Sequence, residues 1–397
     1  MHPPHRGTVL VANPSADRYG SDLQMKESVA GLVEHGWRVV VAAPSDGPLV
    51  EPLLDLGAEV RVLDFPVLRR AAASPSGLTA LALACVRALP RMRALLRRER
   101  PAIVYVNTVT LPWWLLAGRL AGVPTLCHVH EAEAADPPLV RKALALPLLL
   151  ADAVVANSRS TEDVVLGSVP RLGARVRVIH NGVDGPPAAL PAAPRTRREG
   201  SPWQLAVVGR LSARKAPDVA LEAVALLRRR GHDVQVSLYG TPGPGQETYV
   251  AGLHARADQP DLRGAVRFGG YCAPIWSALE GADVLVAPSL GESFGNAVVE
   301  AQLAGRPVVA TAVQGHCETV ADGETGLLVP PQDVGALADT LEELLGDIAR
   351  ADRLADAGRR SAVAHFGSDR YRSDIDAVVR EAIGERSGQP RPASAAV

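Results

Sequence analysis

The sequence has few cysteines, and they lack the spacing that a disulfide framework or a structural zinc site requires. Cys85, Cys127, Cys272 and Cys317 are scattered over 397 residues. They form neither a C-x-x-C pair nor a Cys/His set at ligand spacing. This distribution fits a protein that works in a reducing compartment.

Long apolar runs and a strong net charge are also absent. The best candidate for a membrane span, 139–150, is interrupted by Arg141, Lys142 and Pro147 and is too short to cross a bilayer. The first residues lead into a strand pattern rather than into the apolar core of a signal peptide, which predicts a cytoplasmic protein. The formal net charge is −1, so we expect no nucleic-acid partner.

Three short patterns lack the features of the ligand sites that they suggest. The glycine-rich stretch 240–245 does not have G-x-G-x-x-G spacing, and Lys215 lacks the neighbours of a P-loop lysine. Asp374 and Asp376 have the D-x-D form of a metal site, but they fall within a helical pattern, where side chains two apart diverge. We therefore expect neither a cofactor nor a metal ion.

Short apolar strands alternate with helical stretches along the chain, which indicates an α/β fold of doubly wound parallel sheets. The chain is too long for one ordinary core, so we expect two Rossmann-like domains that face a central cleft. Strands of the first domain are expected at 8–12, 39–43, 59–63, 103–106, 125–129, 153–156 and 176–179. Strands of the second are expected at 204–208, 234–239, 266–268, 284–287, 308–310 and 326–329.

Composition places the domain boundaries. Residues 1–184 form the first domain, and the Pro-, Ala- and Arg-rich segment 185–201 is the expected linker. The second domain covers 202–367, with helices that follow Pro217, Gln246, Ile275, Phe294 and Asp333. A terminal helix within 368–386 is expected to cross back to the first domain, and 387–397 to be a disordered tail.

Two carboxylates, Glu292 and Glu300, flank the start of a predicted helix that follows an apolar strand. If the helix begins near Gly295, the amides of Phe294, Gly295 and Asn296 lie at the positive end of its dipole, which suits a phosphate. One carboxylate can then accept hydrogen bonds from sugar hydroxyls and the other from a ribose diol. Taken alone, a solvated helix start with ordinary surface glutamates is the commoner explanation.

A second cluster favours the phosphate interpretation. The strand at 204–208 ends in Gly209 and Arg210, and Lys215 follows just before an amphipathic helix. A guanidinium offers a planar fork to phosphate oxygens, and an ammonium adds a point charge. The two cations can neutralise a diphosphate leaving group without a metal. The alternative is that both are ordinary surface residues whose side chains extend over the edge of the sheet.

These residues resemble the family-4 retaining glycosyltransferases, whose second domain carries a Gly-Arg-Leu…Lys turn and glutamates at this spacing. The similarity continues through 181–184, 287–289, 304–310, 315–318 and 322–329. It implies the GT-B architecture, with a nucleotide sugar held by the second domain and the acceptor mainly by the first. Three departures bear on the donor sugar: Ala216 and Gln314 stand where the family usually has Gly, and Cys317 replaces a frequent Pro.

In the first domain, a small-residue turn follows the first strand. Gly20 and Ser21 can expose backbone amides, and in the resembling family such a turn approaches the donor phosphates. Asp22 is an acceptor-side candidate, although its position also suits a helix N-cap.

Two histidines share one face of the strand at 125–129, and only His130 lies past its end. In resembling proteins a histidine here contacts the donor sugar near the reacting carbon, and Glu131 beside it is an acceptor-side candidate. We interpret His128 as a core residue.

The function that fits is transfer of a hexose or N-acetylhexosamine from a nucleoside-diphosphate sugar to an acceptor hydroxyl with retention. The catalytic candidates are His130, Arg210, Lys215 and Glu292, and UDP is the expected nucleotide. The sequence does not identify the acceptor, which can be a small molecule, a lipid-linked molecule or a glycan. The alternatives are a nucleotide-sugar 2-epimerase of similar fold and, last, a two-lobed ligand-binding protein.

The basic and apolar residues of 87–98 recur at helical intervals. Weak peripheral contact with an anionic membrane is one interpretation of this pattern. We favour a solvated helix face, with Pro90 breaking any long amphipathic stripe.

Overall fold

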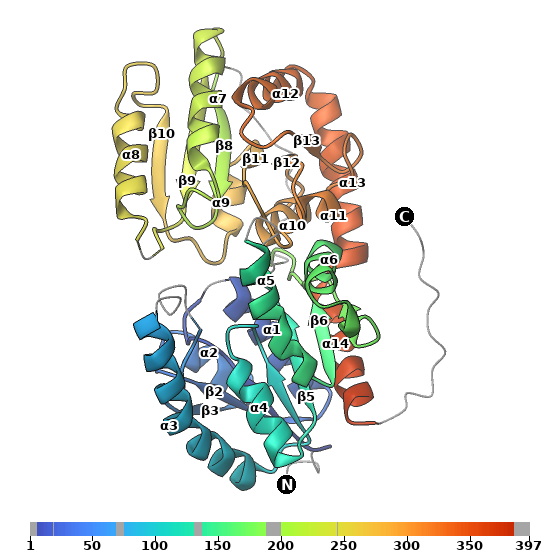
Figure 1. The fold of residues 1–397 in the computed structure, drawn as a ribbon. Helices are drawn as coiled ribbons and strands as arrows, with labels where there is room; N and C mark the ends of the chain where they lie inside the picture. Colours follow the sequence, from blue (N-terminus) through green and yellow to red (C-terminus); the bar gives the residue numbers. More distant parts are fainter. Residues whose placement is uncertain are drawn as a thin grey trace. The chain divides into compact units, whose positions relative to one another are not determined.

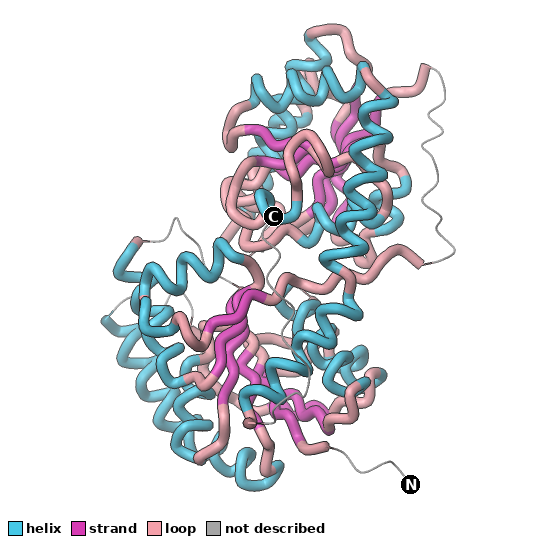
Figure 2. Tube along the Cα trace, turned by 90° about the vertical axis from the view of Figure 1, so that its right-hand side faces the viewer, coloured by secondary structure: helices cyan, strands magenta, loops and turns pink. Residues whose placement is uncertain are grey.

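The computed structural model describes residues 6–18, 20–68, 75–130, 137–187, 200–243 and 245–384. The chain divides into two compact units, the first made of Met1–Gly182 and Ser368–Val397 and the second of Val183–Gly367. Each unit contains a parallel sheet with helices on both faces (Figures 1 and 2). The predicted α/β class with two doubly wound sheets is confirmed.

The described part of the first unit contains a seven-stranded sheet in the order β3-β2-β1-β4-β5-β6-β7. Its strands are β1 (Thr8–Ala12), β2 (Arg38–Ala43), β3 (Glu59–Val62), β4 (Ile103–Val106), β5 (Thr125–Val129), β6 (Ala153–Ala156) and β7 (Val176–Val178). Its helices are α1 (Gly20–Glu34), α2 (Val50–Asp55), α3 (Pro75–Glu99), α4 (Pro112–Ala121), α5 (Pro138–Ala145), α6 (Arg159–Ser168) and α14 (Ser368–Ala382). The chain winds outward from β1 to β3 and then continues at β4 on the other side of β1, so the winding direction switches between β1 and β4.

Side chains of β1 alternate between two buried layers, because successive residues of a strand point to opposite faces of the sheet. Val9 and Val11 pack in a cluster with residues of α1 and α14. Leu10 and Ala12 pack in a second cluster with residues of α3 and α4. Burial on both faces explains why the strand is a continuous apolar run rather than an alternating one.

The second unit has a six-stranded sheet in the order β10-β9-β8-β11-β12-β13. Its strands are β8 (Trp203–Val208), β9 (Val234–Tyr239), β10 (Val266–Gly270), β11 (Val284–Ala287), β12 (Val308–Thr311) and β13 (Leu327–Val329). Its helices are α7 (Pro217–Arg229), α8 (Glu247–Ala257), α9 (Trp276–Glu280), α10 (Asn296–Leu303), α11 (His316–Thr319), α12 (Val334–Gly346) and α13 (Ile348–Phe366). Here the winding direction switches between β8 and β11.

Two helices of the second unit, α11 and α13, were not among those predicted from the sequence. Helix α13 follows α12 after one residue, Asp347, whose carboxylate accepts a hydrogen bond from the amide of Arg350 at 2.8 Å. Helix α3 continues through Pro90, as a helix with this proline in its interior. None of the described helices is both long enough and apolar enough to span a membrane.

Helix α14 packs against α1 within the first unit. Its Asp376 accepts a hydrogen bond from the Trp37 indole at 2.8 Å, and Tyr371 bonds with Ser28 at 2.5 Å. Asp374 pairs with Arg370 at 2.7 Å, so both carboxylates of the D-x-D pattern have protein partners. Most of the predicted linker, 188–199, and the whole tail, 387–397, lie outside the described residues.

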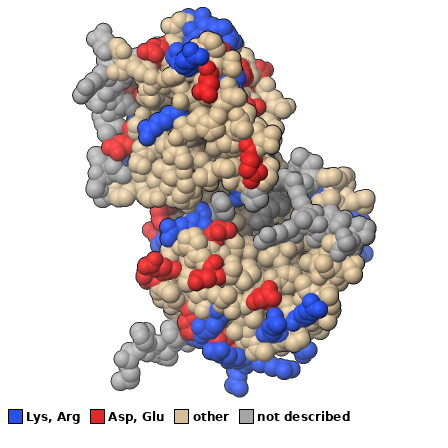
Figure 3. Space-filling view, turned by 90° about the vertical axis from the view of Figure 1, so that its left-hand side faces the viewer, with Lys and Arg blue, Asp and Glu red and all other residues tan. Residues whose placement is uncertain are grey.

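Charges of both signs are distributed over the surface of each unit. On the face drawn in Figure 3, Lys and Arg side chains lie close to Asp and Glu side chains. This mixture agrees with the formal net charge of −1.

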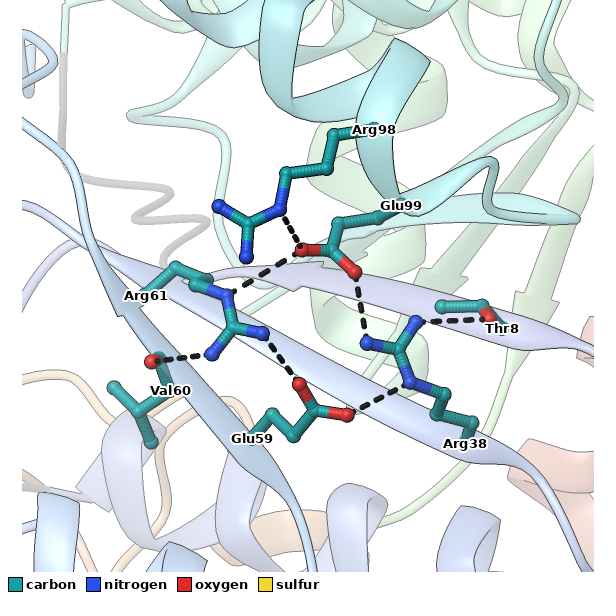
Figure 4. A network of polar contacts seen from close by, with 7 residues as sticks. All are labelled: Thr8, Arg38, Glu59, Val60, Arg61, Arg98 and Glu99. Atoms are coloured by element: carbon teal, nitrogen blue, oxygen red, sulfur yellow. Dashed lines mark hydrogen bonds and ion pairs between the residues drawn. The ribbon is translucent and has the colours of Figure 1, made fainter.

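Glu99, the last residue of α3, lies between arginines of β2 and β3 (Figure 4). Its side chain is 4% exposed and accepts hydrogen bonds from Arg38 at 2.8 Å and from Arg61 at 3.4 Å. Glu59 joins the same two arginines from the other side. Burial raises the pKa of Glu99, but the hydrogen bond from Arg38 and the charges of both arginines outweigh burial and leave it below its ordinary value.

Replacing Glu99 by Gln removes a charge that three guanidinium groups face, those of Arg38, Arg61 and Arg98. We expect the free energy of unfolding to fall by about 2 kcal/mol at neutral pH. A carboxyl with a lowered folded-state pKa contributes its full stabilisation above its unfolded value, about 4.5, and loses it as the pH falls from there through the folded-state value, so the difference between variant and wild type should shrink over that range. Urea unfolding at pH 7 and at pH 3.5 measures both quantities. Glu51→Gln, at an exposed position of α2, is the matched control, and an equal loss at both pH values would contradict the interpretation.

Candidate functional site

A pocket in the second unit lies beyond the carboxyl ends of β8 and β11, where the winding direction of that sheet switches. Parallel sheets bind ligands at such points because the two neighbouring loops leave in opposite directions. Its lining includes Gly209, Arg210, Lys215, Ser289, Glu292, Gly295 and His316. This β8/β11 pocket brings together five of the predicted site residues.

The turn after β8 depends on two glycines. Gly209 has φ +146° and Gly240, after β9, has φ +150°. A Cβ atom at Gly240 would overlap the carbonyl oxygen of Gly209, so the two strand ends can approach only because Gly240 has no side chain. The Arg210 side chain then crosses Gly243, where a Cβ atom would lie 2.8 Å from Arg210 Cδ.

The same turn ends at Ala216, the N-cap of α7, which is left-handed at φ 48°. A left-handed non-glycine residue costs about 1 kcal/mol, which explains why glycine is usual here. The Ala216 methyl group is buried in the core, which offsets about 0.8 kcal/mol of that cost. The turn directs the Lys215 side chain back past Gly209, so that a Cβ atom at Gly209 would lie 3.5 Å from Lys215 Cε.

Lys215 forms an ion pair with Glu292 inside the pocket. The Glu292 side chain is only 11% exposed. Burial raises its pKa, but the charges of Lys215 and Arg214 and the hydrogen bond from Lys215 outweigh burial, so the net pKa lies below its ordinary value. Glu292 is therefore an ionised, acceptor-only group at neutral pH.

The backbone of Glu292 is held from the loop before α11. The Gln314 side-chain oxygen accepts a hydrogen bond from the Glu292 amide at 3.1 Å, and the Gly315 amide donates to the Glu292 carbonyl at 2.8 Å. Gly315 permits this approach, since a Cβ atom there would overlap the backbone of Phe294. Gln314 therefore contributes a side-chain acceptor that glycine at this position lacks.

Helix α10 begins at Asn296, one residue after the predicted start, with Gly295 as its N-cap at φ 102°. Gly295 and Ala297 line the pocket at the positive end of the helix dipole. The Phe294 side chain is buried and packs edge-on against Phe366, with ring centroids 5.4 Å apart, so only its backbone can serve a ligand.

Glu300 lies in the second turn of α10 and is not part of the pocket lining. It keeps partial contact with solvent. Burial nevertheless raises its pKa to about 8, although the charge of Lys215 opposes the change. The two glutamates of the pattern therefore differ in their protonation behaviour, which sequence spacing does not reveal.

In the first unit, a chain of buried polar groups joins Asp22 to His130. Asp22 accepts a hydrogen bond from Asn13 Nδ2 at 2.8 Å, and Asn107 Nδ2 donates to Asn13 Oδ1 at 2.7 Å. His130 Nε2 then meets Asn107 Oδ1 at 3.1 Å. Because each amide oxygen can only accept, the chain requires a proton on His130 Nε2. Neither asparagine was predicted from the sequence; they follow β1 and β4, between which the winding direction of that sheet switches.

Asp22 does not cap α1. The helix begins at Gly20, so Asp22 is its third residue, and its 2% exposed carboxylate also accepts hydrogen bonds from Ser15. Gly20 is exposed, and the Ser21 carbonyl accepts a hydrogen bond from Asn107 at 3.1 Å. The donor-binding role of this turn stays a prediction.

His128 of β5 and His130, which follows the strand, have different environments. His128 is fully buried, and its Nδ1 lies 2.6 Å from the Tyr105 hydroxyl, which agrees with its interpretation as a core residue. Burial lowers the pKa of His130 to about 3, so its ring is neutral. Glu131 lies outside the described residues.

Two family descriptions match the chain: "Glycosyltransferase Family 4" covers residues 20–185, and "Glycosyl transferases group 1" covers residues 203–347. Glycogen synthase of Mycobacterium tuberculosis is 30% identical over 74% of this chain and 72% of that protein. The chain belongs to glycosyltransferase family 4. A second relative of this family-4 glycosyltransferase, the D-inositol 3-phosphate glycosyltransferase of Stackebrandtia nassauensis, is 31% identical over 73% of this chain and 72% of its own.

A solved structure shares the fold of the family-4 enzyme. Anabaena Alr3699/HepE, crystallised with UDP-glucose, superimposes with a TM-score of 0.78 at 22% identity, covering 95% of this chain and 100% of that one. The resemblance stated from the sequence and the expected GT-B fold are thereby confirmed. The site residues themselves are located by the geometry described above, and their roles are proposals.

Glu300→Gln should change how stability depends on pH. The folded-state pKa of Glu300, about 8, exceeds the unfolded value of 4.5, so ionisation of the unfolded chain lowers wild-type stability as the pH rises between these values. We expect the variant to gain about 1 to 2 kcal/mol over wild type between pH 5 and pH 8, since Glu300 keeps some solvent contact. Urea unfolding at both pH values measures this gain. Glu324→Gln, at an exposed position, is the control, and a pH-independent difference would refute the expectation.

Asn107→Asp should raise the pKa of His130. A carboxylate in place of the Asn107 amide would face His130 Nε2 and favour the charged ring, by about one to three pKa units. NMR titration of the His130 ring measures the change from its starting value of about 3. The His130 ring of the wild-type protein, measured under the same conditions, provides the reference. An unchanged His130 titration would show that the chain of amides does not control this ring.

Proposed function

We propose that this glycosyltransferase transfers a hexose or N-acetylhexosamine from a UDP-sugar to an acceptor hydroxyl, with retention of configuration and without a metal. One observation carries the proposal. Arg210, Lys215, Glu292 and the start of α10 converge on a single pocket at the switch point of the second sheet.

The cationic side of the pocket suits the diphosphate. In a transfer from a nucleoside-diphosphate sugar, negative charge grows on the leaving diphosphate as the glycosidic bond breaks. Arg210, Lys215 and the positive end of α10 are positioned to stabilise that charge before the reaction begins. Preorganised groups of this kind lower the barrier because they need no rearrangement in the transition state.

The anionic side of the pocket suits the sugar. Glu292 is ionised and nearly buried, so its oxygens accept hydrogen bonds from hydroxyl groups and repel phosphate oxygens. A bound diphosphate would share the charge of Lys215, which now pairs with Glu292. Glu300, whose pKa is raised to about 8, is the proposed partner of the ribose diol.

His130 is proposed to contact the donor sugar near the reacting carbon. Its neutral ring, with the proton on Nε2, leaves Nδ1 as an acceptor. Retention implies attack from the face that the diphosphate leaves, with a phosphate oxygen helping to remove the acceptor proton. No nucleophilic side chain is required for this path.

The nucleotide sugar is supported by the fold neighbour, whose structure contains UDP-glucose. The acceptor is open between a small molecule, a lipid-linked molecule and a glycan. Thermal-shift screening against nucleoside diphosphates and their sugars tests the donor, because a ligand of the folded state raises its stability. Incubating the donor without an acceptor separates this proposal from a 2-epimerase, which would form an epimer rather than slowly hydrolyse the donor.

Lys215→Ala and Arg210→Ala should each lower turnover by about 10²- to 10³-fold, because each removes a charge that stabilises the leaving diphosphate. The rate of UDP release from UDP-glucose measures turnover, and circular dichroism verifies the fold. Arg267→Ala, at an exposed position of β10, is the matched control and should be neutral. Near-normal release by both pocket variants would defeat the assignment.

A further inference from the structure

His316, the first residue of α11, is a buried side chain of the β8/β11 pocket to which sequence analysis assigned no role. Its exposed fraction is 2%, and it lines the pocket together with Glu292 and Gly295. Its Nδ1 lies 3.2 Å from the carbonyl oxygen of Thr311 and 3.4 Å from the Thr311 hydroxyl.

These contacts determine where the imidazole carries its proton. The Thr311 carbonyl can only accept, and the Thr311 hydroxyl gives its own proton to the Ser289 carbonyl at 2.6 Å. Both oxygens of Thr311 therefore accept from His316, which requires a proton on Nδ1. Burial lowers the pKa of His316 to about 4, so the ring is neutral and Nε2 keeps its lone pair.

The Nε2 atom faces the pocket beside Gly295. A Cβ atom at Gly295 would lie 3.3 Å from His316 Nε2 and 3.6 Å from Cγ of Glu292, so both side chains surround the same glycine. Among the described residues, no hydrogen-bond partner of Nε2 is present in the structure. His316 lines the pocket, so this lone pair is available to a hydrogen-bond donor on a bound ligand.

We propose that His316 Nε2 accepts a hydrogen bond from a hydroxyl group of the donor sugar, next to the hydroxyl that Glu292 binds. Two adjacent acceptors, one of them an anion, match hydroxyl groups and oppose phosphate oxygens, which carry no proton at neutral pH. This inference rests on the proposed function, because it assigns the sugar to the Glu292 side of the same pocket. His316 is then a residue that determines donor specificity.

Calorimetric titration of the full chain with UDP and with UDP-glucose tests the proposal. His316→Phe keeps a ring of similar size and removes the acceptor. It should therefore weaken the affinity for UDP-glucose about tenfold, which corresponds to the loss of one hydrogen bond, and change the affinity for UDP by less than about twofold. His316→Gln places an oxygen near the position of Nε2 and should recover part of the loss. Cys317→Ala, at the next and exposed residue, is the control.

Each other outcome has a definite meaning. An equal loss of affinity for UDP and for UDP-glucose would show that His316 contacts the nucleotide. No loss of affinity for either ligand would show that His316 only supports the loop. Both outcomes overturn the inference. If His316→Phe does not fold, weakening of UDP-glucose relative to UDP in His316→Gln decides the question. If the wild-type protein binds neither ligand, the proposed function itself fails, and this inference fails with it.

Discussion

The reversal of winding direction between two adjacent parallel strands is the constraint on which the functional groups depend. At β8 and β11 the connecting loops leave in opposite directions, so the strand ends are left uncovered and a pocket forms there. The turn after β8 supplies Lys215, and the loop after β11 supplies Glu292. The first sheet repeats the arrangement at β1 and β4, whose ends supply Asn13 and Asn107.

Burial of charge is the energetic problem of the β8/β11 pocket. Removing Lys215 and Glu292 from water costs several kcal/mol per ion unless the geometry compensates. Their mutual contact holds the carboxylate in place, together with the hydrogen bond that the Glu292 amide donates to Gln314 and the one that its carbonyl accepts from Gly315. The result is a site whose electrostatic field is already organised, which is the property that catalysis by charge stabilisation requires.

The first unit orients its histidine by a different physical device. Asp22 accepts a hydrogen bond from Asn13, which accepts one from Asn107, so the oxygen of Asn107 is left to accept one from His130. The buried Asp22 carboxylate thus determines, through two amides, which tautomer the His130 ring adopts. Helix α14 is part of the same unit. Its Tyr371 bonds with Ser28 of α1, and Ser28 bonds with Tyr105, whose hydroxyl contacts His128 of β5. The C-terminal segment therefore belongs to the packing that supports this site.

From the sequence alone, the strand positions, the turn at Gly209 and the helix start near Gly295 could be predicted, because each leaves a local pattern of apolar periodicity or glycine placement. Contacts among Asn13, Asn107 and His130 could not, since they join residues far apart in the chain that only the order of strands brings together. The same holds for His316, whose proton position depends on packing against Thr311. Local patterns determine which elements form, whereas tertiary structure decides which polar groups meet and which protonation state each one keeps.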